Sequence, residues 1–160
     1  PALRWLPRGD NSMQFHIGYG WLPNLSPERM ENRLWEQALF QGGKMEEEWA
    51  WLARGRLEQR HIEFTSGVAH RFRGMLRVSR LLSGMRWGAA LWDEVFWNLN
   101  SLTKGPAAGF DQNRFFVGPL VQVMPGCRLE LGYLSNFVGK GATTPSTLTH
   151  IFFTAVNLDF

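Results

Sequence analysis

The sequence predicts an all-β fold, an antiparallel transmembrane up-and-down β-barrel, and three observations support this. Polar and apolar residues alternate with a period of two, as in Arg128-Leu129-Glu130-Leu131, which is typical of strands with one polar and one apolar face. Most alternating segments have 10 to 14 residues, longer than the mean globular strand of about 5 to 6 and long enough to cross a bilayer. Aromatic residues gather at both ends of the segments on the apolar face, which favours an exterior that meets lipid.

The chain is expected to form one domain, residues 1–160, with about eight complete strands. Gly, Pro, Asn and Ser gather between the alternating segments, where turns need them. Residues 1–6 have the pattern of the end of one further strand. The expected strands are Met13–Leu22, Arg33–Gln41, Trp49–His61, Val68–Arg80, Trp87–Asn98, Phe110–Val123, Cys127–Phe137 and Thr147–Phe160.

The connections between these strands fall into two alternating sets. Segments 7–12, 42–48, 81–86 and 124–126 are on average shorter than segments 23–32, 62–67, 99–109 and 138–146. Outer-membrane barrels have short periplasmic turns and longer external loops. We therefore expect the first set of connections, and the C-terminus, at the periplasmic side.

Aromatic placement gives an independent indication of this orientation, because Trp and Tyr collect at the two membrane interfaces. A soluble β-barrel, with aromatic residues in its core and arginines in water, remains an alternative. The expected membrane girdle consists of Trp49, Trp51, Trp87 and Phe160 at the periplasmic ends and Trp21, Trp97 and Phe137 at the external ends.

The segment Arg33–Gln41 also has the features of a helix. Ser26-Pro27-Glu28 resembles a capped helix start, and apolar residues then recur at the helical period up to Gly42-Gly43. The barrel context favours a strand in spite of this propensity. We assign the segment to the wall, without predicting which of its residues face inward.

Composition excludes several classes of protein. No stretch approaches the roughly 18 uninterrupted apolar residues of a membrane helix. The single Cys127 can form neither an internal disulfide nor a multi-thiolate metal site. Of the 17 Lys and Arg residues, 14 are Arg, and they recur at alternate positions inside apolar segments. This distribution argues against nucleic-acid binding and favours planar, desolvated ion pairs.

Alternation places a set of charged residues on the polar face, which would line the barrel lumen. Arginines outnumber carboxylates in this set, and an unpaired buried charge costs several kcal/mol. The set forms either a salt-bridged plug or a passage that attracts small anions. The expected network is Arg54, Arg56, Glu58, Arg60, Arg71, Arg73, Arg77, Glu94, Arg114, Arg128, Glu130 and Asp159.

Asp93 and Glu94 are adjacent, so in a regular strand one of the two carboxylates would face lipid. A β-bulge between Trp92 and Val95 would turn both inward. The alternative is that Asp93 lies closer to a membrane interface.

The sequence indicates no catalytic site, metal site or cofactor. His16 and Ser79 fall on the polar face but on nonadjacent strands. His61, His70 and His150 fall near the external interface, where a lipid-modifying hydrolase could act. Polar residues at a headgroup boundary explain these histidines more simply. The main hypothesis is a structural barrel or a passage for a small anionic solute, and the alternative is an interfacial hydrolase.

The chain resembles a bacterial outer-membrane barrel family known only as domain-of-unknown-function family 2490. The motifs that carry the resemblance are ENRLWEQALF, RGRLEQRHIE, HRFRGMLR, LWDEVFWNLN, GFDQNRFFVG, RLELGYLSNF and HIFFTAVNLDF. Together they cover nearly the whole chain. The resemblance implies a location in the outer membrane and strands upstream of residue 1, but it implies no substrate. Because single-chain bacterial barrels usually have an even number of strands, we expect a parent of ten or twelve strands.

The last strand has the features of a membrane-barrel terminus. Alternate residues from Phe152 to Phe160 are mostly apolar, and the chain ends on an aromatic residue. Such an end is similar to the signal that the barrel-assembly machinery recognises. The expected partners are therefore outer-membrane lipid and that machinery.

Overall fold

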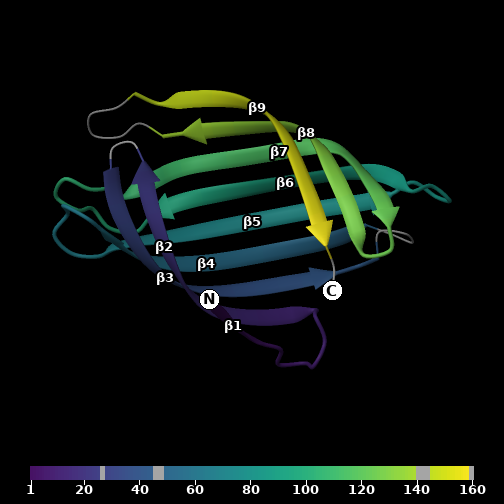
Figure 1. Ribbon diagram of the computed structural model, residues 1–160, viewed down its shortest axis with the longest axis horizontal. Coiled ribbons are helices and arrows are strands. Elements are labelled where there is room, and N and C mark those ends of the chain that lie inside the picture. The colour runs from purple at the N-terminus through teal and green to yellow at the C-terminus, as the bar shows by residue number, and fades with distance from the viewer. Residues whose placement is uncertain (26–27, 45–48, 140–144, 159–160) are drawn as a thin grey trace.

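The computed structural model describes residues 1–25, 28–44, 49–139 and 145–158. Within them nine strands form one antiparallel sheet, and each strand pairs with the next one along the chain (Figure 1). The prediction of an all-β antiparallel fold is confirmed. The strands are β1 (Ala2–Trp5), β2 (Met13–Leu25), β3 (Glu28–Gly42), β4 (Ala50–Ile62), β5 (Ala69–Leu81), β6 (Trp87–Asn98), β7 (Gly109–Met124), β8 (Cys127–Val138) and β9 (Thr147–Leu158).

The sheet is not closed into a barrel, contrary to the sequence prediction. Its edges are β1 and β9, which do not pair with each other. β1 has only four residues and covers β2 from Phe15 to Gly18. Beyond Tyr19, β2 has no strand on that side within the described part of the chain. A closed barrel has no unpaired strand edge, so closure of this sheet would require β1 and β9 to pair.

The sheet is nevertheless strongly curled. Arg77 of β5 reaches Glu130 of β8 with a guanidinium-to-carboxylate distance of 2.5 Å, although two strands lie between them. One cavity is lined both by Arg4 of β1 and by Leu158 of β9, the two edge strands. We call the concave side, which carries these ion pairs, the inner face, and the opposite side the outer face.

β3 confirms the assignment of residues 33–41 to a strand and extends it at both ends. The pairing of β2 with β3 continues without interruption from Met13↔Phe40 to Leu25↔Glu28. The long loop expected over residues 23–32 is therefore wrong. Pro23 lies within β2, and Pro is tolerated where a strand has an unpaired edge, as β2 has there.

An apolar cluster fills part of the inner face, which the sequence analysis did not anticipate. Trp92 and Phe116 stack with ring centroids 5.5 Å apart, and Phe153 of β9 packs edge-on against Phe116 at 5.2 Å. The buried members of the cluster are Leu81, Ala90, Trp92, Phe116, Leu120 and Leu134. The interior thus has an apolar region on β5 to β8 beside a charged region centred on β3 to β6.

β7 and β8 approach each other closely at a pair of glycines. A Cβ atom on Gly118 would lie 2.0 Å from the Leu131 carbonyl oxygen, and one on Gly132 would lie 2.5 Å from the Val117 carbonyl oxygen. Only glycine fits at such distances.

Among the described residues no helix is long and apolar enough to cross a membrane.

Candidate functional site

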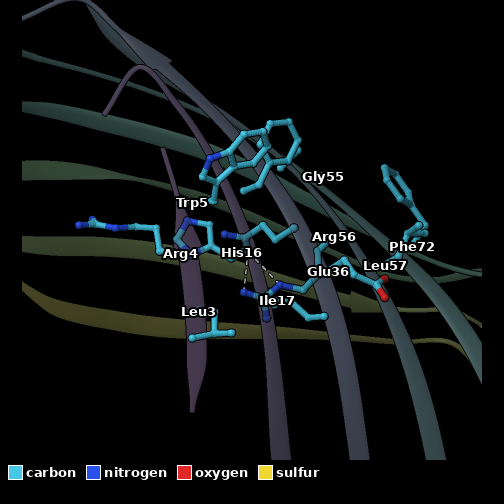
Figure 2. Close-up of a pocket in the computed structure, with 13 residues that line it drawn as sticks. Leu3, Arg4, Trp5, His16, Ile17, Glu36, Gly55, Arg56, Leu57 and Phe72 are labelled. Atoms are coloured by element: carbon cyan, nitrogen blue, oxygen red, sulfur yellow. Dashed lines mark hydrogen bonds between the residues drawn. The ribbon is translucent and has the colours of Figure 1, made fainter. Parts of the chain in front are cut away.

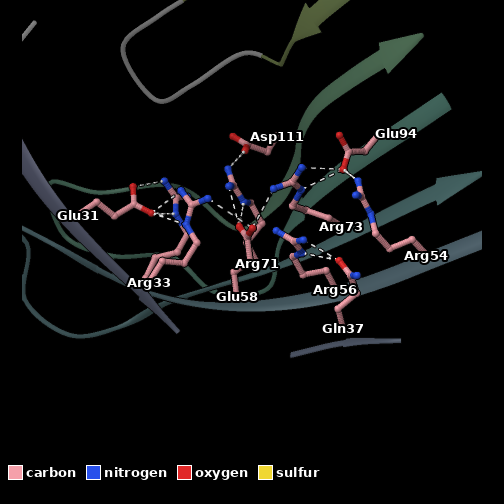
Figure 3. Close-up of polar contacts among 11 residues, drawn as sticks. Glu31, Arg33, Gln37, Arg54, Arg56, Glu58, Arg71, Arg73, Glu94 and Asp111 are labelled. Carbon is pink, nitrogen blue, oxygen red and sulfur yellow. Dashed lines mark hydrogen bonds and ion pairs between the residues drawn. The ribbon is translucent and has the colours of Figure 1, made fainter. Parts of the chain in front are cut away.

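Alternation along β4 and β5 places six arginines on the inner face, and the pairing of the strands brings them close together. Arg56 of β4 lies directly opposite Arg73 of β5. Guanidinium groups at this spacing repel one another unless carboxylates lie among them. Figure 3 shows that carboxylates from several strands do so. The six are Arg54, Arg56 and Arg60 on β4 and Arg71, Arg73 and Arg77 on β5.

Glu58 is the centre of the ion-pair network and is only 1% exposed. Its carboxylate lies 2.7 Å from Nη2 of Arg71 and 3.0 Å from Nη1 of Arg73. Nη1 of Arg33, on β3, lies 3.5 Å away. Three guanidinium groups thus surround one buried carboxylate, and these charge-assisted hydrogen bonds offset its desolvation.

Glu94 on β6 extends the network and is 4% exposed. Its Oε1 accepts hydrogen bonds from Nη2 of Arg54 at 2.5 Å and from Nη2 of Arg73 at 2.7 Å. Arg73 therefore bridges Glu58 and Glu94 (Figure 3). Its guanidinium also lies 4.5 Å from the ring of Phe96, which Arg114 approaches at 5.0 Å.

Glu31 and Arg33 belong to the network, and the sequence analysis missed both. Oε1 of Glu31 accepts from Nη2 of Arg33 at 2.7 Å and from Nε of Arg60 at 2.8 Å. Which face of the sheet these two residues occupy was not predicted, because their segment has the features of both a helix and a strand. The alternation of Glu31, Arg33 and Trp35 would have placed them, since Trp35 lies opposite Glu58.

Asp111 is a third network residue that was not predicted from the sequence, and a β-bulge explains why. Phe96 pairs with Gln112 and Trp97 with Phe110, so Asp111 is an extra residue in β7. Its carboxylate lies 3.2 Å from Nη1 of Arg71 on the inner face. A bulge that turns a carboxylate inward was expected, but at residues 92–95 of the neighbouring strand.

That expected bulge is wrong, because residues 92–95 of β6 pair in regular register with β7. Glu94 faces inward and Asp93 faces outward, as the pleat requires. Asp93 is half-buried near the middle of β6, and Nδ2 of Asn113 donates a hydrogen bond to it at 2.7 Å. The hydrogen bond from Asn113 on β7 thus stabilises the outward Asp93 carboxylate, and no β-bulge is needed to turn it inward.

Two inward-facing residues continue the network toward β8. Arg77 makes a two-pronged contact with Glu130, at 2.5 and 3.0 Å, and Glu130 is 2% exposed. Nδ2 of Asn157 on β9 donates to the same carboxylate at 2.8 Å. This group of residues ties β5, β8 and β9 together across the interior.

Arg56 differs from its neighbours because its hydrogen-bond partner among the described residues is an amide. Nε and Nη2 of Arg56 donate to Oε1 of Gln37 at 2.9 and 2.6 Å, and its guanidinium lies 4.3 Å from the ring of Trp35. Arg56 thus adds positive charge to the inner face without a contacting carboxylate among the described residues.

A polar cavity of about 800 Å³ lies on the inner face at the end that carries the turn before β2. Hydrogen bonds from the Ser12 hydroxyl and backbone N–H hold the pKa of Asp10 below its usual value, so this carboxylate stays ionised at neutral pH. Among the described residues, the cationic side chains that line the cavity are Arg4, Lys44, Arg77 and Arg128. Arg77 is paired with Glu130.

The residues expected in the membrane girdle lie on the outer face and are exposed, insofar as the structure describes them. Asp159 and Phe160, which were expected in the lumen network and in the girdle, lie outside the described residues. Exposed girdle residues are Trp21, Trp49, Trp51, Trp87, Trp97 and Phe137.

The histidines do not form a recognisable catalytic group. Nδ1 of His150 shares a hydrogen bond of 2.5 Å with the Tyr133 hydroxyl, and Ser135 is its partner across the sheet. No hydrogen bond joins the imidazole of His61 or His70 to a hydroxyl or carboxylate within residues 1–25, 28–44, 49–139 and 145–158. No group of three or more His, Cys, Asp or Glu residues in these ranges is arranged to hold a metal ion.

These features define a curled antiparallel sheet protein with a buried arginine–carboxylate network. The model of the family described as "Protein of unknown function (DUF2490)" matches residues 8–147, and the chain belongs to this family. The resemblance stated from the sequence motifs is thereby confirmed. No curated protein and no solved structure matched the chain.

Proposed function

We propose that this chain forms the wall of a β-barrel in the bacterial outer membrane and has a structural, non-enzymatic role. One observation carries the proposal: carboxylates are buried on the inner face while the outer face exposes many large apolar side chains, which is unusual for a water-soluble sheet. Glu58, Glu94 and Glu130 are almost fully buried, whereas large apolar side chains such as Trp97 and Leu76 are exposed. Exposing so much apolar surface to water is costly, whereas a bilayer accommodates it.

The outer faces of the mid-sheet strands support a lipid environment. Leu91, Val117 and Leu76 are all exposed and lie well inside β6, β7 and β5. Apolar outer residues in the middle of strands, with Trp toward their ends, correspond to the apolar band and aromatic girdles of membrane barrels. The partner of this face is accordingly outer-membrane lipid.

The last strand supports assembly by the barrel-assembly machinery. On β9 the outward residues include Phe152, Val156 and Leu158, and all three are exposed. The strand is an edge of the sheet, so its backbone groups on one side are available for pairing with another strand.

Cell fractionation and purification test the membrane assignment. The proposal predicts that the protein is recovered with the outer membrane and needs detergent to remain monodisperse. A folded monomer that stays soluble in plain buffer would overturn it.

A passage for a small anionic solute is a second candidate role, and the polar cavity favours it. The cavity has a volume of about 800 Å³, which admits a small solute, and Arg4 is one of the cationic side chains that line it. The network around Glu58 lies farther inside and fills the space with paired side chains, so the structural role predicts no steady conductance in planar bilayers. A steady, anion-selective conductance that falls on Arg77→Gln would instead establish the passage.

A further inference from the structure

We propose that the inner face beside β1 has a binding site for a phosphate group, formed by Arg4, His16 and Arg56. The inference rests neither on the membrane assignment nor on the structural role. The three residues come from β1, β2 and β4 and follow one another across the sheet (Figure 2). Arg4 pairs with His16, and Gln37 of β3 pairs with both His16 and Arg56. Paired residues of a sheet project from the same face, so all four point inward.

The two arginines of this row make no ion pair within residues 1–25, 28–44, 49–139 and 145–158. Arg4 is exposed and its guanidinium has no hydrogen-bond partner in these ranges, whereas Arg56 donates to the Gln37 amide. The charges of Glu58 and Glu94 act on Arg56, but both carboxylates contact other guanidinium groups. The row therefore carries positive charge that no carboxylate contact neutralises.

Arg56 is held in an orientation that suits an oxyanion. Its guanidinium lies 4.3 Å from the Trp35 ring, and this ring fills the space beside Gly18, where a Cβ atom would overlap it. Gln37 accepts hydrogen bonds from Nε and Nη2. A guanidinium has five N–H groups, so those of Nη1 and the second one of Nη2 remain for a ligand. Such a planar pair of donors matches two oxygens of a phosphate group.

The polar cavity gives a ligand room next to the row. It has a volume of about 800 Å³, within the range of small-molecule sites, and Arg4 lines it. Gln14 lines it too, and Oε1 of Gln14 lies 3.1 Å from Nε2 of His16. Asp10 is a carboxylate of the same cavity, but the Ser12 hydroxyl and backbone N–H already donate to it at 2.6 and 2.8 Å. Its single charge offsets at most one of the two guanidinium groups.

A phosphate group fits these donors better than a carboxylate does. It carries about two negative charges and three terminal oxygens, whereas a carboxylate has one charge and two oxygens. The charges of Arg4 and Arg56 both act on the His16 imidazole, which places the three groups near enough to share one anion. Among the described residues Nδ1 of His16 makes no hydrogen bond, so it can donate to the ligand.

Nitrogen-15 NMR of the labelled chain in dodecyl maltoside tests the site, because the Nε–H signals of arginine respond to anion contacts. The probes are inorganic phosphate and glycerol 3-phosphate, with acetate for comparison, at constant ionic strength and about pH 8, where a phosphate group is a dianion. We expect saturating shifts at Arg56 and its neighbours in the row. The dissociation constant should be about tenfold lower for the phosphate probes than for acetate. The tighter phosphate probe shows whether the site prefers free phosphate or a phosphate ester.

Two variants and a matched control locate the binding. Arg4→Gln removes an exposed guanidinium without a described contact, so it should keep the fold and weaken phosphate binding about tenfold. Arg56→Gln should weaken it at least as much, and if this variant does not fold, Arg4→Gln decides. Arg114→Gln is the control, because it removes the same charge from the inner face at β7, opposite Glu94 and outside the row. It should change the affinity by less than about twofold.

Equal affinity for phosphate and acetate would overturn the proposal, as would an equal loss of affinity in Arg4→Gln and Arg114→Gln. Shifts that grow without saturation at every inner arginine would overturn it too, because they indicate screening alone. A chain that proved soluble in plain buffer would contradict the membrane assignment alone. The same titration then runs without detergent, so the two proposals fail separately.

Discussion

At the scale of single residues, Glu58 has the largest expected effect on stability. Glu58→Gln removes the negative charge that Arg33, Arg71 and Arg73 share while keeping the shape of the side chain. Breaking a buried ion pair costs about 3 to 5 kcal/mol, because the remaining charges are left uncompensated. We expect the urea midpoint of the lipid-reconstituted protein to fall accordingly.

Glu36→Gln is the control for this measurement, since Glu36 is exposed on the outer face and contacts an amide. Its unfolding free energy should change by less than about 1 kcal/mol. An unchanged midpoint for Glu58→Gln would contradict the description of the interior as a salt-bridged plug and would indicate a water-filled lumen.

The charged residues show which parts of the network can be predicted from the alternation of polar and apolar residues. The arginines of β4 and β5 could be placed because strict alternation fixes a side chain's face without knowledge of its partner strand. Asp111 could not, because an extra residue in β7 reverses the alternation at that point. The ion-pair partner of each guanidinium could not be predicted from the sequence either, because it depends on how strongly the sheet curls.

At the scale of the elements, Arg77 and Glu130 connect two nonadjacent strands of the curled sheet. Arg77→Lys keeps the charge but loses the two-pronged contact, which a single ammonium group cannot reproduce. We expect a loss of about 1.5 to 3 kcal/mol in unfolding free energy. Arg80→Lys, at an exposed outward position of the same strand, should change it by less than about 0.5 kcal/mol. Equal effects would show that the contact does not stabilise the curl.

Gly118 tests the close approach of β7 and β8. Gly118→Ala places a methyl group against the Leu131 carbonyl oxygen, and the backbone has to move to relieve this contact. Such overpacking costs about 1 to 3 kcal/mol. Gly55→Ala, whose new methyl group would make an ordinary van der Waals contact with the Phe72 ring at 3.7 Å, should be neutral or stabilising. A similar midpoint shift in both variants would contradict the geometry at Gly118.

β3 shows why local propensity is a weak guide in a sheet. Its sequence has apolar residues at the helical period, yet it pairs in full register with β2 and β4. Pairing on both sides provides backbone hydrogen bonds and cross-strand contacts that an isolated helix would lack. The other strand boundaries followed the alternation closely because no competing period was present.

At the scale of the whole molecule, the central feature is an outer face that exposes large apolar side chains while carboxylates are buried on the inner face. The sequence predicted the two faces because alternation with a period of two is a local property. Closure into a barrel was not predictable from alternation, since it depends on whether the two edge strands of the sheet pair with each other. Within the described residues the curl is complete enough to pack ion pairs and aromatic rings across the interior.

The most direct test of the central claim is the environment of the outer face in the middle of β6. A nitroxide label on Leu91→Cys, in a Cys127→Ser background, is reconstituted in lipid vesicles, and its collisions with oxygen and with a charged nickel chelate are compared. A label on Leu99→Cys, in the loop after β6, is the water-exposed reference. Our account predicts that the label at residue 91 collides mainly with oxygen and the label at residue 99 mainly with the chelate. Equal access of the chelate to both labels would show that the outer face meets water and would contradict the account.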